Sequence, residues 1–158
     1  MNENYILTEL SEDYAKEICS WIYEGEYSIY NFSDWDTVVK NGWDLSLEKT
    51  RRLEFVTILL NKGLVAYGRI SLNEDKVYIG IGIKPSLCGK GYGKKIMKLL
   101  VEECEKRFPD KTVALEVRSF NDRAINCYKK VGFEIKQKYT RKTFDKSEAE
   151  FYYMEYIR

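Results

Sequence analysis

The sequence predicts an α/β domain (α+β in the sense that its sheet is mixed) with one central sheet flanked by helices. The strand–helix–strand run from residues 77 to 117 needs a right-handed crossover, so its two strands should be parallel. Elsewhere short turn signals join β-rich runs directly, which makes those strand pairs antiparallel. The chain has 158 residues, of which 44% are hydrophobic, and contains no linker-like segment. We therefore expect one domain over residues 1–158.

The N-terminal half alternates strand and helix signals. Strands are expected over residues 4–10, 53–60, 64–72 and 77–83. Ser11 is a suitable N-cap for a helix that begins after it. The apolar residues of that helix share one face: Tyr14, Ile18, Trp21 and Ile22. The turn signal Asn61-Lys62-Gly63 predicts a hairpin, and residues 23–48 predict short helical stretches.

The C-terminal half has longer elements. Gly89, Gly91 and Gly93 precede a helix that keeps an apolar face as far as Phe108. A strand over residues 112–117 and a helix over residues 122–131 should follow, and Gly132 is a usual helix C-cap. Two final strands are expected over residues 133–143 and 150–157. The Tyr-rich last strand fits either a core strand or the edge of a homodimer.

The net charge of +1 hides an asymmetry between the two ends of the chain. Residues 1–48 hold 11 acids and 2 bases, a net of −9, whereas residues 49–158 hold 14 acids and 24 bases, a net of +10. The first part should attract cations and the second anions. The basic residues near the C-terminus lack a stacking aromatic pattern, so we expect no nucleic-acid partner.

The residue types present exclude several chemistries. The chain has no histidine, which excludes a Ser-His-Asp triad and His-ligated zinc, and we expect no metal. The four cysteines form no C-x-x-C pair and are interpreted as single reduced thiols. The N-terminus lacks a signal-peptide pattern, and no apolar run is long enough to cross a membrane. We therefore expect a cytoplasmic protein with no membrane association.

A glycine-rich loop joins the strand at residues 77–83 to the following helix. Its three alternating glycines let the backbone approach a ligand closely, and the helix N-terminus offers N–H groups to an anion. Lys90, Lys94 and Lys95 add positive charge. The pattern favours a phosphate or pyrophosphate as the ligand, with a flexible basic turn as the alternative.

Two motifs in this half resemble the GNAT superfamily of N-acetyltransferases. Cys88-Gly-Lys-Gly-Tyr-Gly93 is similar to the pyrophosphate loop of that family, Q/R-x-x-G-x-G/A, with Cys88 in place of Gln or Arg. The run from Asn121 through Ala124 and Tyr128 to Gly132-Phe133 is similar to its N-x-x-A-x-x-x-Y-x-x-x-G-F motif. The resemblance implies a GNAT-like fold with a mostly antiparallel sheet, whose one parallel pair splays around the cofactor.

The resemblance also implies an activity and the residues that serve it. The chain would be an acetyl-CoA-dependent N-acetyltransferase, in which an amine attacks the thioester directly and Tyr128 protonates the leaving thiolate. The backbone of Ile81 and Ile83, together with Asn121, would contact the pantetheine arm. The residues expected at the pyrophosphate are Cys88, Gly89, Lys90, Gly91, Tyr92, Gly93 and Lys94.

Glu116 is the candidate base. It should face the side of its strand opposite Leu115 and Val117. It lies 12 residues before Tyr128, a spacing similar to that of ribosomal-protein alanine acetyltransferases. Alternatively, Glu116 is an ion-paired carboxylate on the sheet surface, and a chain of water molecules removes the proton.

The acidic N-terminal part is the expected acceptor side. Its acid and aromatic side chains suit a cation through charge pairing and cation–π contact. The candidate substrate residues are Glu24, Glu26, Tyr27 and Tyr30. A small cationic amine such as a polyamine or aminoglycoside is the first candidate partner, and a peptide N-terminus is the second. A non-catalytic acyl-CoA-binding module is a third interpretation, suggested by Cys88.

Overall fold

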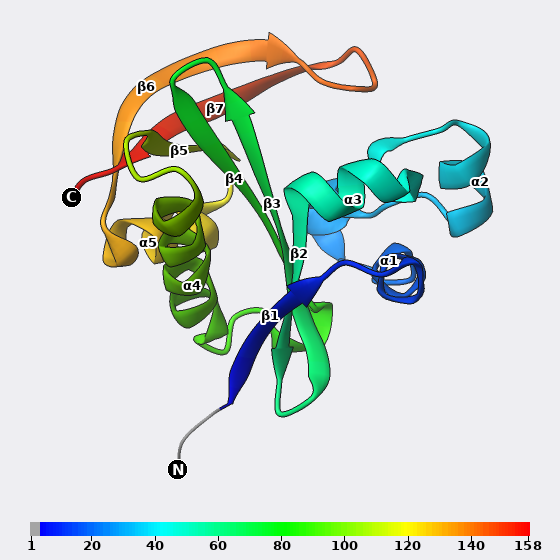
Figure 1. Cartoon of the computed structure of the whole chain (residues 1–158). Helices are drawn as coiled ribbons and strands as arrows, with labels where there is room; N and C mark the ends of the chain where they lie inside the picture. Colours follow the sequence, from blue (N-terminus) through cyan, green and yellow to red (C-terminus); the bar gives the residue numbers. More distant parts are fainter. Residues whose placement is uncertain (1–3) are drawn as a thin grey trace. The chain divides into compact units, whose positions relative to one another are not determined.

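The computed structural model describes residues 4–158 and contains one mixed sheet (Figure 1). The strands are β1 (Tyr5–Glu9), β2 (Phe55–Leu60), β3 (Gly63–Asn73), β4 (Lys76–Ile83), β5 (Thr112–Arg118), β6 (Phe133–Lys142) and β7 (Glu148–Tyr156). The helices are α1 (Glu12–Cys19), α2 (Trp35–Lys40), α3 (Glu48–Glu54), α4 (Tyr92–Arg107) and α5 (Asp122–Val131), with 3-10 turns η1 (Gly25–Tyr30), η2 (Asp44–Ser46) and η3 (Pro85–Leu87). The strand order is β1-β2-β3-β4-β5-β7-β6, and the parallel pair is β4 with β5. The predicted fold class is confirmed.

The chain divides into two compact units. The first ends at Arg69 and also includes Ile81–Cys88, while the second comprises Ile70–Gly80 and Gly89–Arg158. Strands β3 and β4 contribute residues to both units. The expectation of one domain over residues 1–158 stays a prediction.

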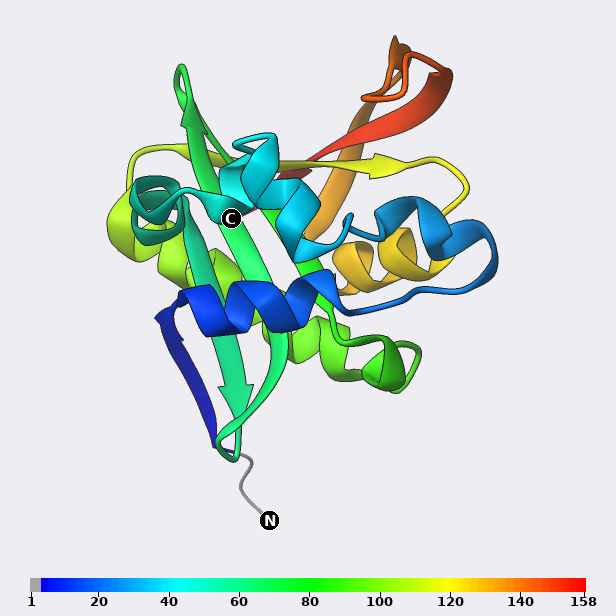
Figure 2. The same ribbon diagram turned by 90° about the vertical axis from the view of Figure 1, so that its right-hand side faces the viewer.

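In the first unit, α1 lies over β2 and β3 (Figure 2). The Ser11 hydroxyl accepts a hydrogen bond from the Tyr14 backbone N–H at 3.1 Å, so the predicted N-cap is confirmed. Nine buried apolar residues of this unit form a cluster: Leu10, Ala15, Ile18, Cys19, Trp21, Val38, Leu45, Phe55 and Leu64. The hairpin between β2 and β3 turns at Asn61 and Lys62, both with positive φ, as a two-residue turn of this hand requires.

The segment before β2 differs from the prediction. The predicted strand from residue 53 begins at Phe55, because helix α3 continues to Glu54. The Arg51 side chain is buried and donates from Nη1 to the Leu45 carbonyl at 3.1 Å. This contact ties α3 to the turn before it, and such an anchor leaves no periodic signal in the sequence.

A close approach between Tyr67 of β3 and Gly82 of β4 shapes the first unit. A Cβ atom at Gly82 would lie 2.1 Å from Cε1 of the Tyr67 ring, so a side chain there has no room. The Tyr67 ring also lies about 6 Å from three other rings, those of Trp21, Phe32 and Phe55. Burial raises the pKa of the Tyr67 phenol, which stays neutral at physiological pH.

In the second unit, β4 and β5 pair over three residues, from Lys76↔Thr112 to Tyr78↔Ala114. Strand β5 then continues alongside β7, from Ala114↔Glu155 to Arg118↔Phe151. Helices α4 and α5 pack against each other, and β6 with β7 forms a long hairpin (Figure 1). The parallel pairing is therefore short, whereas the β6–β7 hairpin pairs nine residues of each strand.

Replacing Gly82 with alanine tests the close approach. We expect Gly82→Ala to lower the free energy of unfolding by about 1–3 kcal/mol, because the new methyl group overlaps the Tyr67 ring. The measurement is urea denaturation followed by circular dichroism.

Gly63→Ala is the matched control, since the nearest atom to its Cβ would be the Leu60 carbonyl oxygen at 3.6 Å. It should change the stability by less than about 0.5 kcal/mol. In a Tyr67→Leu background the cost of Gly82→Ala should fall. An undiminished cost there would contradict the explanation.

Candidate active site

The glycine loop of the second unit ends at the N-terminus of α4. Gly89 and Gly91 have φ values of 73° and 87°, a conformation that favours glycine. Gly91 is the N-cap of α4 and, among the described residues, no side chain caps the helix there. The first backbone N–H groups of α4 are thus available to an anion, next to the exposed side chains of Lys90 and Lys94. The loop also contains Tyr92 and Gly93, both half-buried.

Arg123 on α5 also reaches this loop. Its Nη1 atom lies 3.9 Å from the position a Cβ would take at Gly89. The motif that suggested Asn121 and Tyr128 treats position 123 as variable, so sequence reasoning missed this residue. A guanidinium beside a helix N-terminus is well suited to a phosphate group. The residues present therefore fit the pyrophosphate of coenzyme A.

The Cys88 thiol contacts the backbone just before it. It lies 3.6 Å from the Ile83 carbonyl oxygen and 3.7 Å from that of Lys84. The side chain therefore closes the turn after β4, within the first unit. A Gln or Arg at this position would be too long for the same contact.

Tyr128 is half-buried on α5. Its ring meets that of Phe133 edge-on at 6.2 Å between centroids, and its backbone carbonyl accepts from the Gly132 N–H at 3.1 Å. The neighbouring Cys127 thiol has its pKa raised by burial, an effect that the ammonium groups of Lys130 and Lys94 oppose. This part of α5 belongs to the helix that packs against α4.

Asn121 is the N-cap of α5. Its Oδ1 atom accepts a hydrogen bond from the Ala124 N–H at 3.2 Å, and the residue is 8% exposed. The structure thus gives Asn121 a role in helix capping, which the prediction of a cofactor contact did not include.

Glu116 is exposed on β5, between the buried residues Leu115 and Val117, as the strand alternation predicts. Its carboxylate is 3.4 Å from Nε of Arg141 on β6. The Arg141 guanidinium in turn lies over the Phe151 ring at 4.1 Å from the centroid. Glu116 is therefore ion-paired, as the alternative to a catalytic base predicts.

Ile81 and Ile83 are half-buried at the end of β4, in the first unit. The Ile83 carbonyl accepts a hydrogen bond from the Tyr23 hydroxyl at 2.7 Å. Sequence reasoning missed this bond, because the two residues are 60 positions apart. The contact brings the acidic segment of the chain to the end of the strand predicted to hold the pantetheine arm.

The acidic and aromatic segment from Tyr23 to Asn31 is a closed loop. The Asn31 side chain accepts from the Tyr23 N–H at 2.6 Å and donates to the Tyr23 carbonyl at 3.2 Å. Between these residues lies η1, with Glu24, Glu26 and Tyr30 exposed and Tyr27 half-buried. Three of the four predicted acceptor residues are therefore exposed, on a loop that is closed at its base.

The predicted site residues are divided between the two units. The glycines and lysines of the loop, Glu116, Asn121 and Tyr128 belong to the second unit, while the acceptor residues, Ile81, Ile83 and Cys88 belong to the first. Within residues 4–158, no cluster of three or more Cys, Asp or Glu could hold a metal ion. No helix in this part of the chain has the length and hydropathy of a membrane span.

The family is shown by a comparison with family models. Residues 11–133 match the model of the acetyltransferase (GNAT) family, which is more than half of the chain. The chain belongs to this family, and it is an acetyl-CoA-dependent N-acetyltransferase. The resemblance and the cofactor inferred from the two motifs are therefore confirmed.

Solved structures share the fold at low sequence identity. The ribosomal-protein-S18-alanine N-acetyltransferase from Escherichia coli is 20% identical, with a TM-score of 0.66 over 97% of this chain and 93% of that one. A chimera of the spermidine N-acetyltransferase SpeG from Vibrio cholerae and hSSAT is 15% identical, with a TM-score of 0.76 over 97% of this chain and 95% of the chimera. AAC(6')-Ib in complex with ribostamycin and coenzyme A is 20% identical, with a TM-score of 0.73 over 98% of this chain and 94% of that one. No curated protein sequence is significantly similar to this chain.

Substitutions at Asn121 separate its cap from its predicted cofactor contact. Asn121→Ala should lower the free energy of unfolding by about 1 kcal/mol, whereas Asn121→Asp should keep the cap and the stability. If Asn121 also contacts the pantetheine arm through its amide, Asn121→Asp should raise the KM for acetyl-CoA. Denaturation and steady-state kinetics measure the two effects, and an unchanged KM in Asn121→Asp contradicts the contact.

Proposed function

We propose that this enzyme acetylates the primary amine of a small cationic acceptor, such as a polyamine or an aminoglycoside, by direct attack. The observation that carries the proposal is the Tyr23–Ile83 hydrogen bond. It holds the exposed acidic loop at the end of β4, the strand proposed to bind the pantetheine arm. The proposed catalytic domain is the whole chain, residues 1–158.

The cofactor is held mainly by the second unit in this proposal. The N–H groups from Gly89 to Lys94 bind the pyrophosphate, and the side chains of Lys90, Lys94 and Arg123 balance its charge. The backbone of Ile81 contributes to the pantetheine arm. The Ile83 carbonyl already accepts the Tyr23 hydroxyl, so we assign Ile83 a smaller part. Bound acetyl-CoA supplies the activated acyl carbonyl.

Tyr128 is the proposed general acid. The ordinary pKa of tyrosine, about 10, lies slightly above that of a thiol, about 8.5, so proton transfer to a leaving thiolate is close to balanced. The residue is half-buried on α5, where its ring packs against Phe133.

The acceptor amine must lose a proton before it attacks. At pH 7 this costs about 4–5 kcal/mol for a lysine-like amine but only about 1 kcal/mol for an α-amine. Glu24 and Glu26 are exposed, and their negative charges would attract a dication or trication. Tyr27 and Tyr30 add ring faces for cation–π contact.

A second candidate acceptor is a protein N-terminus. It is favoured by the exposed position of Glu116 on β5, from which a carboxylate can take a proton from an α-amine. We place it second because Glu116 is paired with Arg141 and must leave that pair to act as a base.

Removing the Tyr128 hydroxyl tests the general acid. Tyr128→Phe should lower kcat by about 10²–10⁴-fold with little change in the KM for acetyl-CoA, because only the proton donor is lost. A thiol reagent that reports release of coenzyme A measures the rate. Tyr139→Phe is the control and should keep the wild-type rate, because Tyr139 lies on β6, where its ring stacks on that of Phe151 in β7. Equal rates in Tyr128→Phe and wild type would exclude this role and favour a binding module.

Removing the loop charges tests the acceptor. Glu24→Gln with Glu26→Gln should raise the KM for a polyamine about 2- to 30-fold, since each exposed charge pair is worth about 0.2–1 kcal/mol. The effect should shrink at high salt. Glu12→Gln with Glu48→Gln removes the same charge from the same unit and should leave this KM unchanged.

The same assay separates the two acceptors. Faster acetylation of a peptide with a free N-terminal alanine than of any polyamine or aminoglycoside would overturn the first candidate. The second candidate then requires that Glu116→Gln lower kcat on that peptide.

A further inference from the structure

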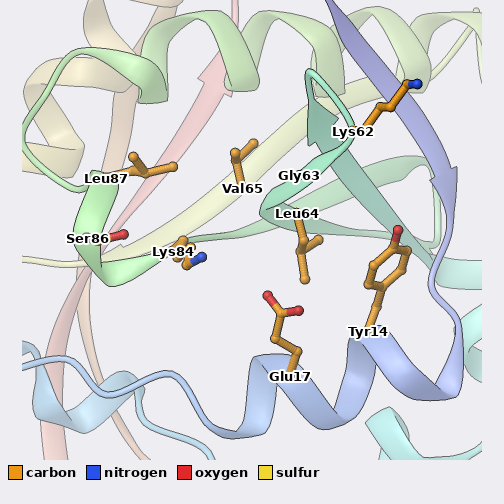
Figure 3. Close-up of a pocket in the computed structure, with 9 residues that line it drawn as sticks. All are labelled: Tyr14, Glu17, Lys62, Gly63, Leu64, Val65, Lys84, Ser86 and Leu87. Atoms are coloured by element: carbon orange, nitrogen blue, oxygen red, sulfur yellow. The ribbon is translucent and has the colours of Figure 1, made fainter.

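A cavity in the first unit is lined by residues that have no assigned part in acetyl transfer, although Lys84, Ser86 and Leu87 lie between Ile83 and Cys88 in the chain. It has a volume of about 460 Å³ and opens between α1, the β2–β3 hairpin and the end of β4 (Figure 3). This is within the size range of small-molecule sites. Its lining residues come from these three places: Tyr14, Glu17, Lys62, Gly63, Leu64, Val65, Lys84, Ser86 and Leu87.

Two opposite charges face this cavity without meeting. Figure 3 shows the carboxylate of Glu17 and the ammonium of Lys84 directed into the same space, with Lys62 directed away. Within the described part of the chain, neither Glu17 nor Lys84 has an ion-pair partner within 4.0 Å. Each charge is therefore open to a ligand group of the opposite sign.

The backbone holds these groups in place. The Lys84 N–H donates to the Val65 carbonyl at 2.8 Å, which ties the end of β4 to β3 at the cavity wall. Glu17 lies on α1, whose opposite side packs into the core through Ala15 and Ile18. The two charges are therefore carried by two separate elements, α1 and the end of β4.

The rest of the lining combines apolar walls with a hydroxyl group. Leu64, Val65 and Leu87 line the cavity, and Leu64 and Val65 are buried. Ser86 is exposed on the same 3-10 turn as Leu87, two residues after Lys84. A ligand that satisfies this lining carries an ammonium, a carboxylate and an apolar body.

We propose that this cavity binds a free α-amino acid with an apolar side chain. The ligand ammonium pairs with Glu17, its carboxylate pairs with Lys84 and accepts from the Ser86 hydroxyl, and its side chain lies against Leu64 and Leu87. The ligand bridges two charges that the fold keeps apart. The site does not depend on the proposed acceptor or on Tyr128.

Calorimetry with the full chain, in the absence of acetyl-CoA, tests the proposal. L-leucine is the probe, and its two truncated analogues are 4-methylpentanoate, which lacks the ammonium, and 3-methylbutylamine, which lacks the carboxylate. We expect leucine to bind at least about tenfold more tightly than either analogue. No binding of leucine at about 10 mM, or equal binding of all three compounds, overturns the proposal.

Charge variants assign the binding to this cavity. Glu17→Gln and Lys84→Met should each weaken leucine binding at least about tenfold, and the swap Glu17→Lys with Lys84→Glu should recover part of it. Glu12→Gln, on the same helix and already paired with Lys16, and Lys49→Met on α3 are the controls and should bind as wild type. Wild-type binding by Glu17→Gln and Lys84→Met overturns the assignment.

A kinetic measurement separates this site from the acceptor site. Leucine should release no coenzyme A from acetyl-CoA at concentrations that saturate the cavity. If leucine does release coenzyme A at those concentrations, and Glu17→Gln abolishes this release, the cavity is the acceptor site. That result would overturn the proposal of a separate amino-acid site. Failure of the polyamine assay leaves the calorimetric test unaffected.

Discussion

The absence of a side chain at Gly82 is the constraint on which much of the first unit depends. The Tyr67 ring lies too close to Gly82 to leave room for a Cβ atom there. The same ring packs near the rings of Trp21, Phe32 and Phe55. Because these rings come from separate segments, the close approach ties the acidic loop to the strand. The next residue, Ile83, then accepts the Tyr23 hydroxyl at 2.7 Å. The missing side chain at Gly82 thus permits the approach of the Tyr67 ring, one residue before the carbonyl that binds Tyr23.

The charge asymmetry of the chain has a structural counterpart in its local elements. The basic half contains a helix N-terminus with two positive-φ glycines before it and Arg123 beside it. The acidic half contains a loop closed by Asn31 on which carboxylates face solvent. In the basic half the side-chain charges and the backbone act in the same direction, since N–H groups and cations both favour an anion. The near-zero net charge conceals both.

Several residues combine a predicted chemical role with a structural one. Asn121 caps α5, Cys88 closes the turn after β4, and Glu116 is held by Arg141. A motif match assigns such residues to a ligand, but the same side chain can also satisfy the backbone. For these three residues the predicted site role would use side chains that already make contacts within the fold.

The sequence by itself determined the parts of this protein that depend on near neighbours. The Ser11 cap, the two-residue turn at Asn61 and Lys62, the glycine loop before α4 and the end of α5 at Gly132 follow from local backbone preferences. The parallel β4–β5 pair followed from the length of its crossover.

Only the tertiary structure decided which distant groups meet. The Tyr23–Ile83 bond, the place of Arg123 beside Gly89, and the facing charges of Glu17 and Lys84 join segments far apart in the chain. The boundary between α3 and β2 also differs from the prediction of a strand from residue 53, because Arg51 is anchored by a carbonyl outside the helix. Side-chain contacts of this kind have no period in the sequence, since packing and burial select them after the elements have formed.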